Sequence, residues 1–305
     1  MTVRTLTTTD TDRLALNLEV PAGTIQVTAE PGRRTAEVRV TALGDDPAVA
    51  AAVRDAHLTW DAERGELAVK IPPMQGGATT IRQSFGTVTA GATVVGAVIS
   101  GDLISIGNAV GGLIIVNGQT VAGGSIEIDA YVPEGAALTA VTGSASLTAT
   151  GEYGPVVYKT TSGDLTVGGA RLLNARSTSG DVRAEVVDGR AIVGSVSGNV
   201  RIGRCDHTEV TTTSGDITLA DFGGYAELTS VSGDITAHAT EGARITARAV
   251  SGDVHITATA TALAEGLHTA ANSVSGRVTS PTGQTDQTGG ATRTRRPRRT
   301  TGGAR

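Results

Sequence analysis

Residues Ser230–Ala239 read SVSGDITAHA, and four close variants of this stretch recur along the chain. They are TTSGDLTVGG from Thr160, STSGDVRAEV from Ser177, TTSGDITLAD from Thr212 and AVSGDVHITA from Ala249. Each variant carries Ser-Gly-Asp followed by a β-branched residue or leucine. The repetition indicates either a binding site multiplied along a surface or a corner that the backbone turns again and again.

The glycines of the Ser-Gly pairs define the period of the repeat. They lie at positions 163, 180, 198, 215, 233, 252 and 276, with steps of 17, 18, 17, 18, 19 and 24 residues. A near-constant step of this size is typical of a stacked repeat. A further glycine follows three of them after nine residues, at Gly189, Gly224 and Gly242. Each repeat is therefore expected to consist of two strand-forming halves.

Apolar side chains keep a fixed register to these glycines. Two and four residues after them lie Leu165 and Val167, Val182 and Ala184, Val200 and Ile202, Ile217 and Leu219, Ile235 and Ala237, and Val254 and Ile256. Five and seven residues before them lie Tyr158 and Val156, Ala175 and Leu173, Val193 and Ala191, Val210 and Thr208, Leu228 and Ala226, and Ala247 and Ile245. Both sets alternate with period two, which predicts strands with one inward face. Coils stacked about 4.8 Å apart would align these residues along a narrow core.

The Ser-Gly-Asp stretch is best interpreted as a corner, in which glycine supplies a backbone angle that other residues resist. Five corner aspartates would stack in a column: Asp164, Asp181, Asp216, Asp234 and Asp253, with Asn199 and Arg277 at the equivalent positions of two further copies. We expect each aspartate to accept backbone N–H groups of its own turn. The alternative is a row of Ca²⁺ sites between successive coils. The Gly-Gly-x-Gly-x-Asp signature of calcium-binding β-rolls is absent from the sequence. We therefore expect no bound metal ion or other cofactor.

Hydroxyl groups also repeat beside the corner. Thr161, Thr178, Val196, Thr213, Val231 and Val250 form one column, and Thr160, Ser177, Ser195, Thr212 and Ser230 form the next. Such columns could match a ligand lattice, but strand propensity with the hydroxyls facing solvent explains them more simply.

The rest of the chain divides into three parts. Residues 1–72 alternate like strands around one helix, which Asp46 would cap and Pro47 would begin, with helical composition continuing to Trp60. Residues 73–124 are rich in glycine and apolar residues and predict turns and short strands, as an insertion before the array at 125–280. Residues 281–305 lack apolar periodicity, which predicts disorder.

The run TTSGDLTV…STSGDVRA…SVSGNVRI…TTSGDITL…SVSGDITA…AVSGDVHI, with its lead-in IEIDAYVPEGAALTAVTGSASL, resembles the bacterial "putative adhesin" or Toastrack-type β-solenoid domain. That family is of unknown function and is common in actinobacteria. The lead-in echoes LNLEVPAGTIQV near the N-terminus, so the resemblance covers most of residues 1–280. It implies an all-β, parallel β-solenoid with an N-terminal β-rich segment that carries one short helix. We expect the usual right-handed crossover.

Charge and cysteine content bear on location and partners. The chain carries a net charge of −5 and one cysteine, Cys205, so the fold does not depend on an internal disulfide. The N-terminal residues lack the pattern of a signal peptide, which favours a cytoplasmic location. Five arginines gather near the C-terminus and could bind a polyanion such as lipid head groups or nucleic acid: Arg293, Arg295, Arg296, Arg298 and Arg299. A solvated tail without a ligand is the alternative.

The sequence favours a non-enzymatic structural or interaction protein. The acids recur evenly, without the clustering that acid–base catalysis needs. His207, His238 and His255 occupy different places in their repeats, although His238 and His255 could approach each other on adjacent coils. Cys205 near His207 is a conceivable nucleophile, but neighbours in sequence rarely form a catalytic pair.

Some relatives in this family are linked to cell-envelope stress, and by analogy we expect such a link here. We also expect a protein partner, which the sequence does not identify. We expect a monomer or small oligomer. The alternatives are an exported surface adhesin and a polysaccharide-active β-helix enzyme.

Overall fold

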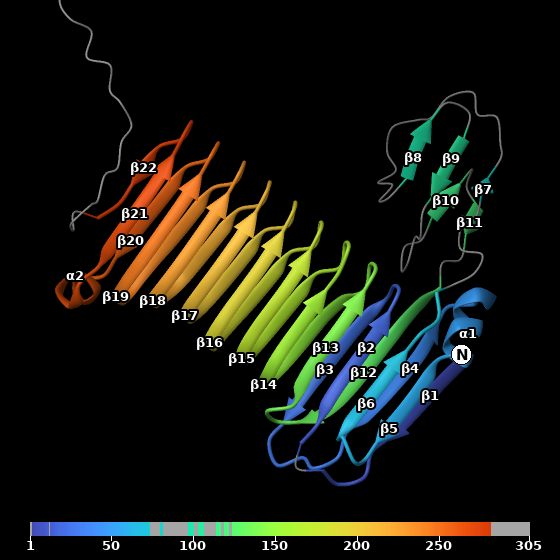
Figure 1. The fold of residues 1–305 in the computed structure, drawn as a ribbon. Helices are drawn as coiled ribbons and strands as arrows, with labels where there is room; N and C mark the ends of the chain where they lie inside the picture. The colour runs from blue at the N-terminus through green and yellow to red at the C-terminus, as the bar shows by residue number, and fades with distance from the viewer. Residues whose placement is uncertain are drawn as a thin grey trace, which may run out of the picture.

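The computed structural model describes residues 2–11, 13–73 and 124–281, together with short backbone strands between residues 80 and 121. The first three ranges form an elongated stack of β-strands (Figure 1). Helix α1 (Pro47–Arg54) lies near one end of the stack and helix α2 (Ala260–Glu265) at the other.

Six long strands form the body of the stack, and each one makes a complete coil together with the corner that follows it. They are β14 (Ser146–Lys159), β15 (Leu165–Ser177), β16 (Val182–Ser195), β17 (Val200–Thr212), β18 (Ile217–Ser230) and β19 (Ile235–Ala249). Each pairs with the next in parallel, and the pairing register shifts near the middle of the strand. We call this shift the bend and the Ser-Gly-Asp stretch between strands the corner. The bend separates two faces, wall 1 formed by the first halves of the strands and wall 2 formed by the second halves.

Shorter strands extend both walls at each end of the array. Wall 1 continues from β14 through β3 (Thr24–Glu30), β12 (Ser125–Pro133), β4 (Glu37–Leu43) and β1 (Thr2–Thr7), and at the other end through β20 (Val254–Ala258) and β22 (Val278–Thr279). Wall 2 continues from β14 through β13 (Ala137–Thr142), β2 (Ala15–Val20), β6 (Glu66–Lys70) and β5 (His57–Asp61), and at the other end through β21 (His268–Ser273). The N-terminal segment is thus continuous with the repeat array.

The core lies between the two walls. Every residue that the glycine register predicted to face inward is buried, which confirms the alternation. Burying one valine, leucine or isoleucine side chain contributes roughly 1.5–3 kcal/mol, so these ladders provide the main stabilisation of the coils. One inward residue is polar: Thr208 is 1% exposed, and its hydroxyl has no hydrogen-bond partner.

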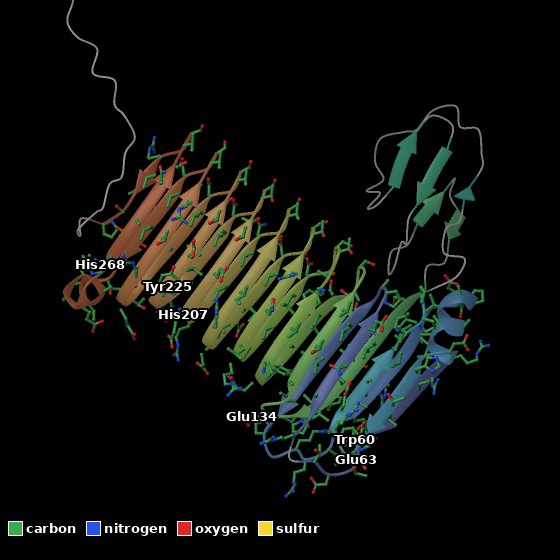
Figure 2. All side chains as sticks on the ribbon, in the orientation of Figure 1. Trp60, Glu63, Glu134, His207, Tyr225 and His268 are labelled. Atoms are coloured by element: carbon green, nitrogen blue, oxygen red, sulfur yellow. The ribbon has the colours of Figure 1, made fainter. Side chains whose placement is uncertain are left out.

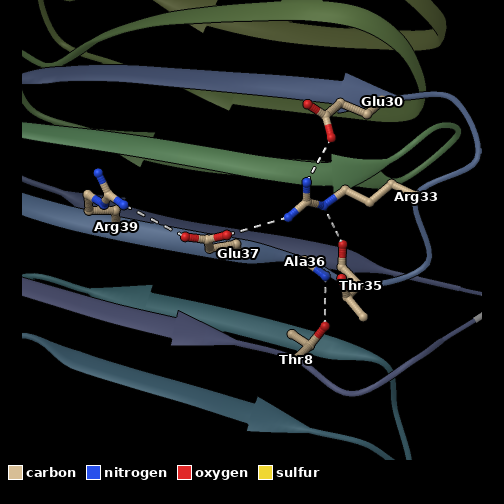
Figure 3. Close-up of polar contacts among 7 residues, drawn as sticks. All are labelled: Thr8, Glu30, Arg33, Thr35, Ala36, Glu37 and Arg39. Atoms are coloured by element: carbon tan, nitrogen blue, oxygen red, sulfur yellow. Dashed lines mark hydrogen bonds and ion pairs between the residues drawn. The ribbon is translucent and has the colours of Figure 1, made fainter.

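A charged network fixes the turn between β3 and β4 on the outer face of wall 1 (Figure 3). The Arg33 guanidinium lies 2.7 Å from the Glu30 carboxylate and 3.6 Å from that of Glu37, and 5.5 Å from the centre of the Tyr131 ring. Beside it, the Ala36 N–H donates to the Thr8 hydroxyl over 2.8 Å. These contacts hold the turn against β1 and β12.

Helix α1 begins as the sequence predicted, because the Asp46 carboxylate accepts a hydrogen bond from the Ala48 N–H at 2.8 Å. The expectation that helical structure continues to Trp60 is wrong. The helix ends at Arg54, and residues 57–61 form β5, which pairs with β6. Leu58 and Trp60 pack against the core, while their sequence neighbours are exposed. This alternation buries apolar surface in a strand, and it overrides the local helix propensity.

Two further parts belong to the portion of the chain that the structure describes. Between residues 80 and 121 the backbone forms β7 (Thr80–Ile81), β8 (Ala97–Ser100) and β9 (Leu103–Ile106) in one small sheet, and β10 (Ile114–Val116) and β11 (Gln119–Val121) in another.

Helix α2, which the sequence pattern did not indicate, lies between β20 and β21. The Thr259 hydroxyl accepts the Ala262 N–H at 3.1 Å, and Gly266 ends the helix at φ 99°. This insertion accounts for the longer last step of the repeat.

Candidate functional site

The corner aspartates lie in a single column along one edge of the solenoid. In each, the Oδ1 atom accepts the backbone N–H of the equivalent residue on the next coil. The bonds run from Asp164 to Asp181 (2.9 Å), Asp181 to Asn199 (2.8 Å), Asn199 to Asp216 (3.0 Å), Asp216 to Asp234 (2.8 Å), Asp234 to Asp253 (2.7 Å) and Asp253 to Arg277 (2.7 Å). The expectation that each aspartate binds its own turn is therefore wrong: the column links neighbouring coils.

This ladder explains how like charges can stack at strand spacing. A carboxylate oxygen that accepts an N–H gains a charge-assisted hydrogen bond, which offsets repulsion between neighbouring aspartates. Asn199 supplies the same acceptor without charge, and Arg277 ends the column through its backbone N–H. In the part of the chain that the structure describes, no group of three or more His, Cys, Asp or Glu side chains is placed to hold a metal ion. The calcium row stays a hypothesis.

Hydroxyl side chains close the corner from inside. Thr160, Ser177, Ser195, Thr212, Ser230 and Ser273 each accept the backbone N–H of the glycine three residues later, at 2.7–3.0 Å. Most of this column is buried, so the expectation that its hydroxyls face solvent is wrong. The column that follows it, which includes Val196, Val231 and Val250, is exposed instead. The inner hydroxyls serve the turn and are not presented to a ligand.

The corner glycines are required by space. A Cβ atom on Gly180 would lie 1.8 Å from the carbonyl oxygen of Gly163, and one on Gly198 would lie 2.0 Å from that of Gly180. None of the corner glycines has positive φ, so the expectation of an unusual backbone angle is wrong. Glycine is needed because the backbones of adjacent coils approach closely here.

The histidines and the cysteine do not assemble a catalytic pair. The Cys205 thiol is buried and lies 3.2 Å from the carbonyl oxygen of His207, while the His207 ring lies 5.3 Å from the ring of Tyr225 on the outer face. His238 pairs in register with Thr257, and its Nδ1 atom lies 2.7 Å from the Thr257 hydroxyl. His238 therefore does not face His255 across the strands.

Sequence reasoning missed a group of outward side chains on wall 2. We call Arg190, His207, Glu209, Tyr225, Glu227 and Arg248 the wall 2 cluster. His207 and Tyr225 are register partners on β17 and β18, and their side chains project at the same edge of the stack (Figure 2). Each lies eight residues before a corner glycine, a position the core does not constrain. That shared offset was the available signal.

Five arginines predicted to bind polyanions, Arg293, Arg295, Arg296, Arg298 and Arg299, lie outside the described residues. Among the described residues, no helix is long and apolar enough to cross a membrane.

Comparison with known proteins finds one matching family and several matching solved structures. A family model described as Toastrack DUF4097 matches residues 114–303, which is more than half of the chain. The solved structures that match include the crystal structure of a putative adhesin from Parabacteroides merdae ATCC 43184, with 8% identity and a TM-score of 0.35 over 92% of this chain and 95% of that one. A search of curated proteins finds no match.

Proposed function

The chain belongs to the Toastrack DUF4097 family, and on that premise we propose that it is a non-enzymatic interaction module. In this proposal the solenoid is a rigid support, and its outer faces bind the partner. The proposal rests on the observation that the conspicuous corner residues have structural roles. The repeated aspartates and hydroxyls bind backbone N–H groups, and the repeated glycines allow close packing of the coils.

Catalysis makes different demands on the same residue types. A general acid or base must reach the reacting atom, and a nucleophile must contact a base that another group orients. Here the Asp216 carboxylate is bonded to the Asp234 N–H, and the Cys205 thiol faces a carbonyl oxygen. Both groups therefore have structural partners, which supports a binding role.

The test of the non-enzymatic proposal is a turnover assay on the full chain. Neutral and acidic polysaccharides are incubated with the protein, and new reducing ends are measured. We expect no cleavage above a buffer control. Cleavage that disappears in Asp216→Asn or in Glu209→Gln, both of which keep the side-chain shape, would establish the polysaccharide-active alternative.

We further propose that the module is a cytoplasmic protein linked to the cell-envelope stress response, by analogy with the family resemblance alone. The exported adhesin is the second candidate, and the wall 2 cluster favours it because exposed aromatic and charged side chains gather there. Fractionation of the native cell tests both proposals, with the cytoplasm, membrane and wall assayed by antibody. The cytoplasmic location expected from the sequence is tested by the same measurement. Recovery only from the wall or the medium would favour the adhesin.

A further inference from the structure

The outer face of wall 2 differs in charge from the corner edge. From the position eight residues before each corner glycine up to the corner, the strands β14–β19 carry five cationic side chains and two carboxylates. The cations are Lys159, Arg176, Arg190, Arg244 and Arg248, and the carboxylates are Glu209 and Glu227. The corner edge of the same coils presents five aspartates and no cation before Arg277. An anionic molecule would therefore be attracted to wall 2 and repelled by the corner edge.

One column on this face runs along the axis of the stack. Arg190, His207, Tyr225, Arg244 and His268 are successive register partners on neighbouring coils. The His207 and Tyr225 rings are 5.3 Å apart and tilted by 32°, and Tyr225 is 36% exposed. Adjacent coils are about 4.8 Å apart, so the column offers a linear ligand a series of regularly spaced contacts.

The two carboxylates beside this column are held in place. Glu209 and Glu227 are direct register partners, an arrangement of like charges that costs stability in a sheet. Arg190 lies 3.0 Å from Glu209, and Arg248 lies 3.0 Å from Glu227. The Tyr225 hydroxyl also donates to Glu227 over 3.4 Å. The core does not require this unfavourable pair, and local conflicts of this kind mark functional sites.

The chemistry of the cluster selects among anionic ligands. Ionised carboxylates only accept hydrogen bonds, so Glu209 and Glu227 suit a ligand rich in hydroxyl donors, which the phosphate backbone of DNA lacks. Tyr225 and His207 are exposed on the outer face, and aromatic rings suit the flat apolar side of a sugar ring. Arg244, which has no ion-pair partner among the described residues, is free to bind a carboxylate of the ligand.

We propose that the wall 2 cluster, with Arg244, binds a linear acidic polysaccharide along the solenoid axis. The hydroxyl groups of the sugar donate to Glu209 and Glu227, its rings stack on Tyr225 and His207, and its carboxylates bind Arg244. This inference rests on the proposed function, since it names the class of molecule that the module binds.

The test is calorimetric titration of the full chain with polygalacturonate oligomers at low salt, with dextran and single-stranded DNA as comparison ligands. Tyr225→Ala and Arg244→Gln should each weaken polygalacturonate binding about tenfold, the loss of roughly one stacked ring or one charge-assisted pair. The matched control is Arg201→Gln, which removes an exposed arginine from the outer face of wall 1 and should change affinity less than twofold. Thermal unfolding of each variant confirms that it is folded.

Three results would overturn the proposal. They are the absence of polygalacturonate binding, binding that Tyr225→Ala and Arg244→Gln leave unchanged, and DNA binding that is as tight and is lost in the same variants. A reducing-end assay on the same samples separates this inference from the proposed function. Cleavage of the bound polysaccharide would contradict the non-enzymatic role while leaving the saccharide site in place.

Discussion

At the corner edge, successive coils place the same residue types in the same register, whereas at the bend the register shifts between every pair of neighbouring strands from β14 to β19. Glycine, a hydroxyl residue and aspartate or asparagine recur at the corner because backbone atoms of adjacent coils approach and bond there. At the bend, the residues differ from coil to coil.

This difference explains how steps of 17, 18 and 19 residues fit one stack. Register is fixed at the corner, and the extra residues are accommodated at the bend, where Gly224 adopts a φ of 96°. It also explains where distinctive chemistry occurs. The Arg190–His207–Tyr225–Arg244 column begins immediately after the bend, where outward side chains are not needed for coil-to-coil bonding.

The largest expected effect comes from crowding the corner. In Gly198→Ala the new methyl group would lie 2.0 Å from the Gly180 carbonyl oxygen, so the coils must separate. We expect a loss of about 3 kcal/mol or more in the free energy of unfolding, measured by urea titration. The matched control is Gly194→Ala, where nothing lies within 4 Å of the new methyl group. Equal stability of the two variants would show that the corner is not the constraint.

Alkaline pH should lower the free energy of unfolding, because two buried tyrosines of β14 ionise. Burial raises the pKa of Tyr158, whose hydroxyl donates to Ala145 at the corner, and of Tyr153, whose hydroxyl donates to Val27 near the bend. Each pKa is raised above its unfolded value of about 10, so the stabilisation is complete below pH 10 and is lost as pH rises. Between pH 10 and the raised pKa of the folded state, each tyrosine should lower the free energy of unfolding by at most about 1.4 kcal/mol per pH unit.

Urea titrations at pH 9 and pH 11 measure the slope of the free energy of unfolding against pH. Tyr158→Phe and Tyr153→Phe should each flatten it. A slope that neither variant alters would contradict the assignment.

Breaking the aspartate ladder should have a smaller effect. Asp216→Ala removes the acceptor of the Asp234 N–H and should cost about 1 kcal/mol, because water can replace a hydrogen bond at this exposed edge. Asp216→Asn should stay within about 0.5 kcal/mol of the parent, since Asn199 already serves in the ladder. If the asparagine variant were as unstable as the alanine variant, charge would matter more than the hydrogen bond.

Replacing Thr208, which lies just after the bend, should stabilise the protein, whereas the changes above destabilise it. Its buried hydroxyl has no partner, so Thr208→Val should raise the free energy of unfolding by about 1 kcal/mol. Thr211→Val, on the exposed side of the same strand, is the control and should change little. A loss of stability in Thr208→Val would mean that the hydroxyl does have a role in the core.

The smallest expected effect is that of calcium on the corner column. Because one oxygen of each aspartate binds the next coil, we expect millimolar Ca²⁺ to leave the melting temperature unchanged. A rise of several degrees that a chelator reverses would instead establish the calcium row.

The sequence predicted the array well because its signals are local. The corner glycines and the alternation around residues such as Ile217 and Leu228 could be counted directly. The partner of each aspartate could not, because an acceptor on the same turn and one on the next coil fit the same repeat. The wall 2 cluster was missed as well, because the residue type at its shared offset from the corner glycines changes from coil to coil, as His207 and Tyr225 show. The helix expected to reach Trp60 failed because burial of Leu58 and Trp60 outweighs local propensity.

The aspartate ladder has a consequence for how such a protein changes length. Each coil offers its neighbour an acceptor on one side and an N–H on the other, so every junction between corners is interchangeable. Duplication of one unit of 17 to 19 residues within a gene would therefore lengthen the rod by about 4.8 Å and demand no new type of contact. Evolution could adjust the reach of the molecule in fixed increments while its two ends stay unaltered.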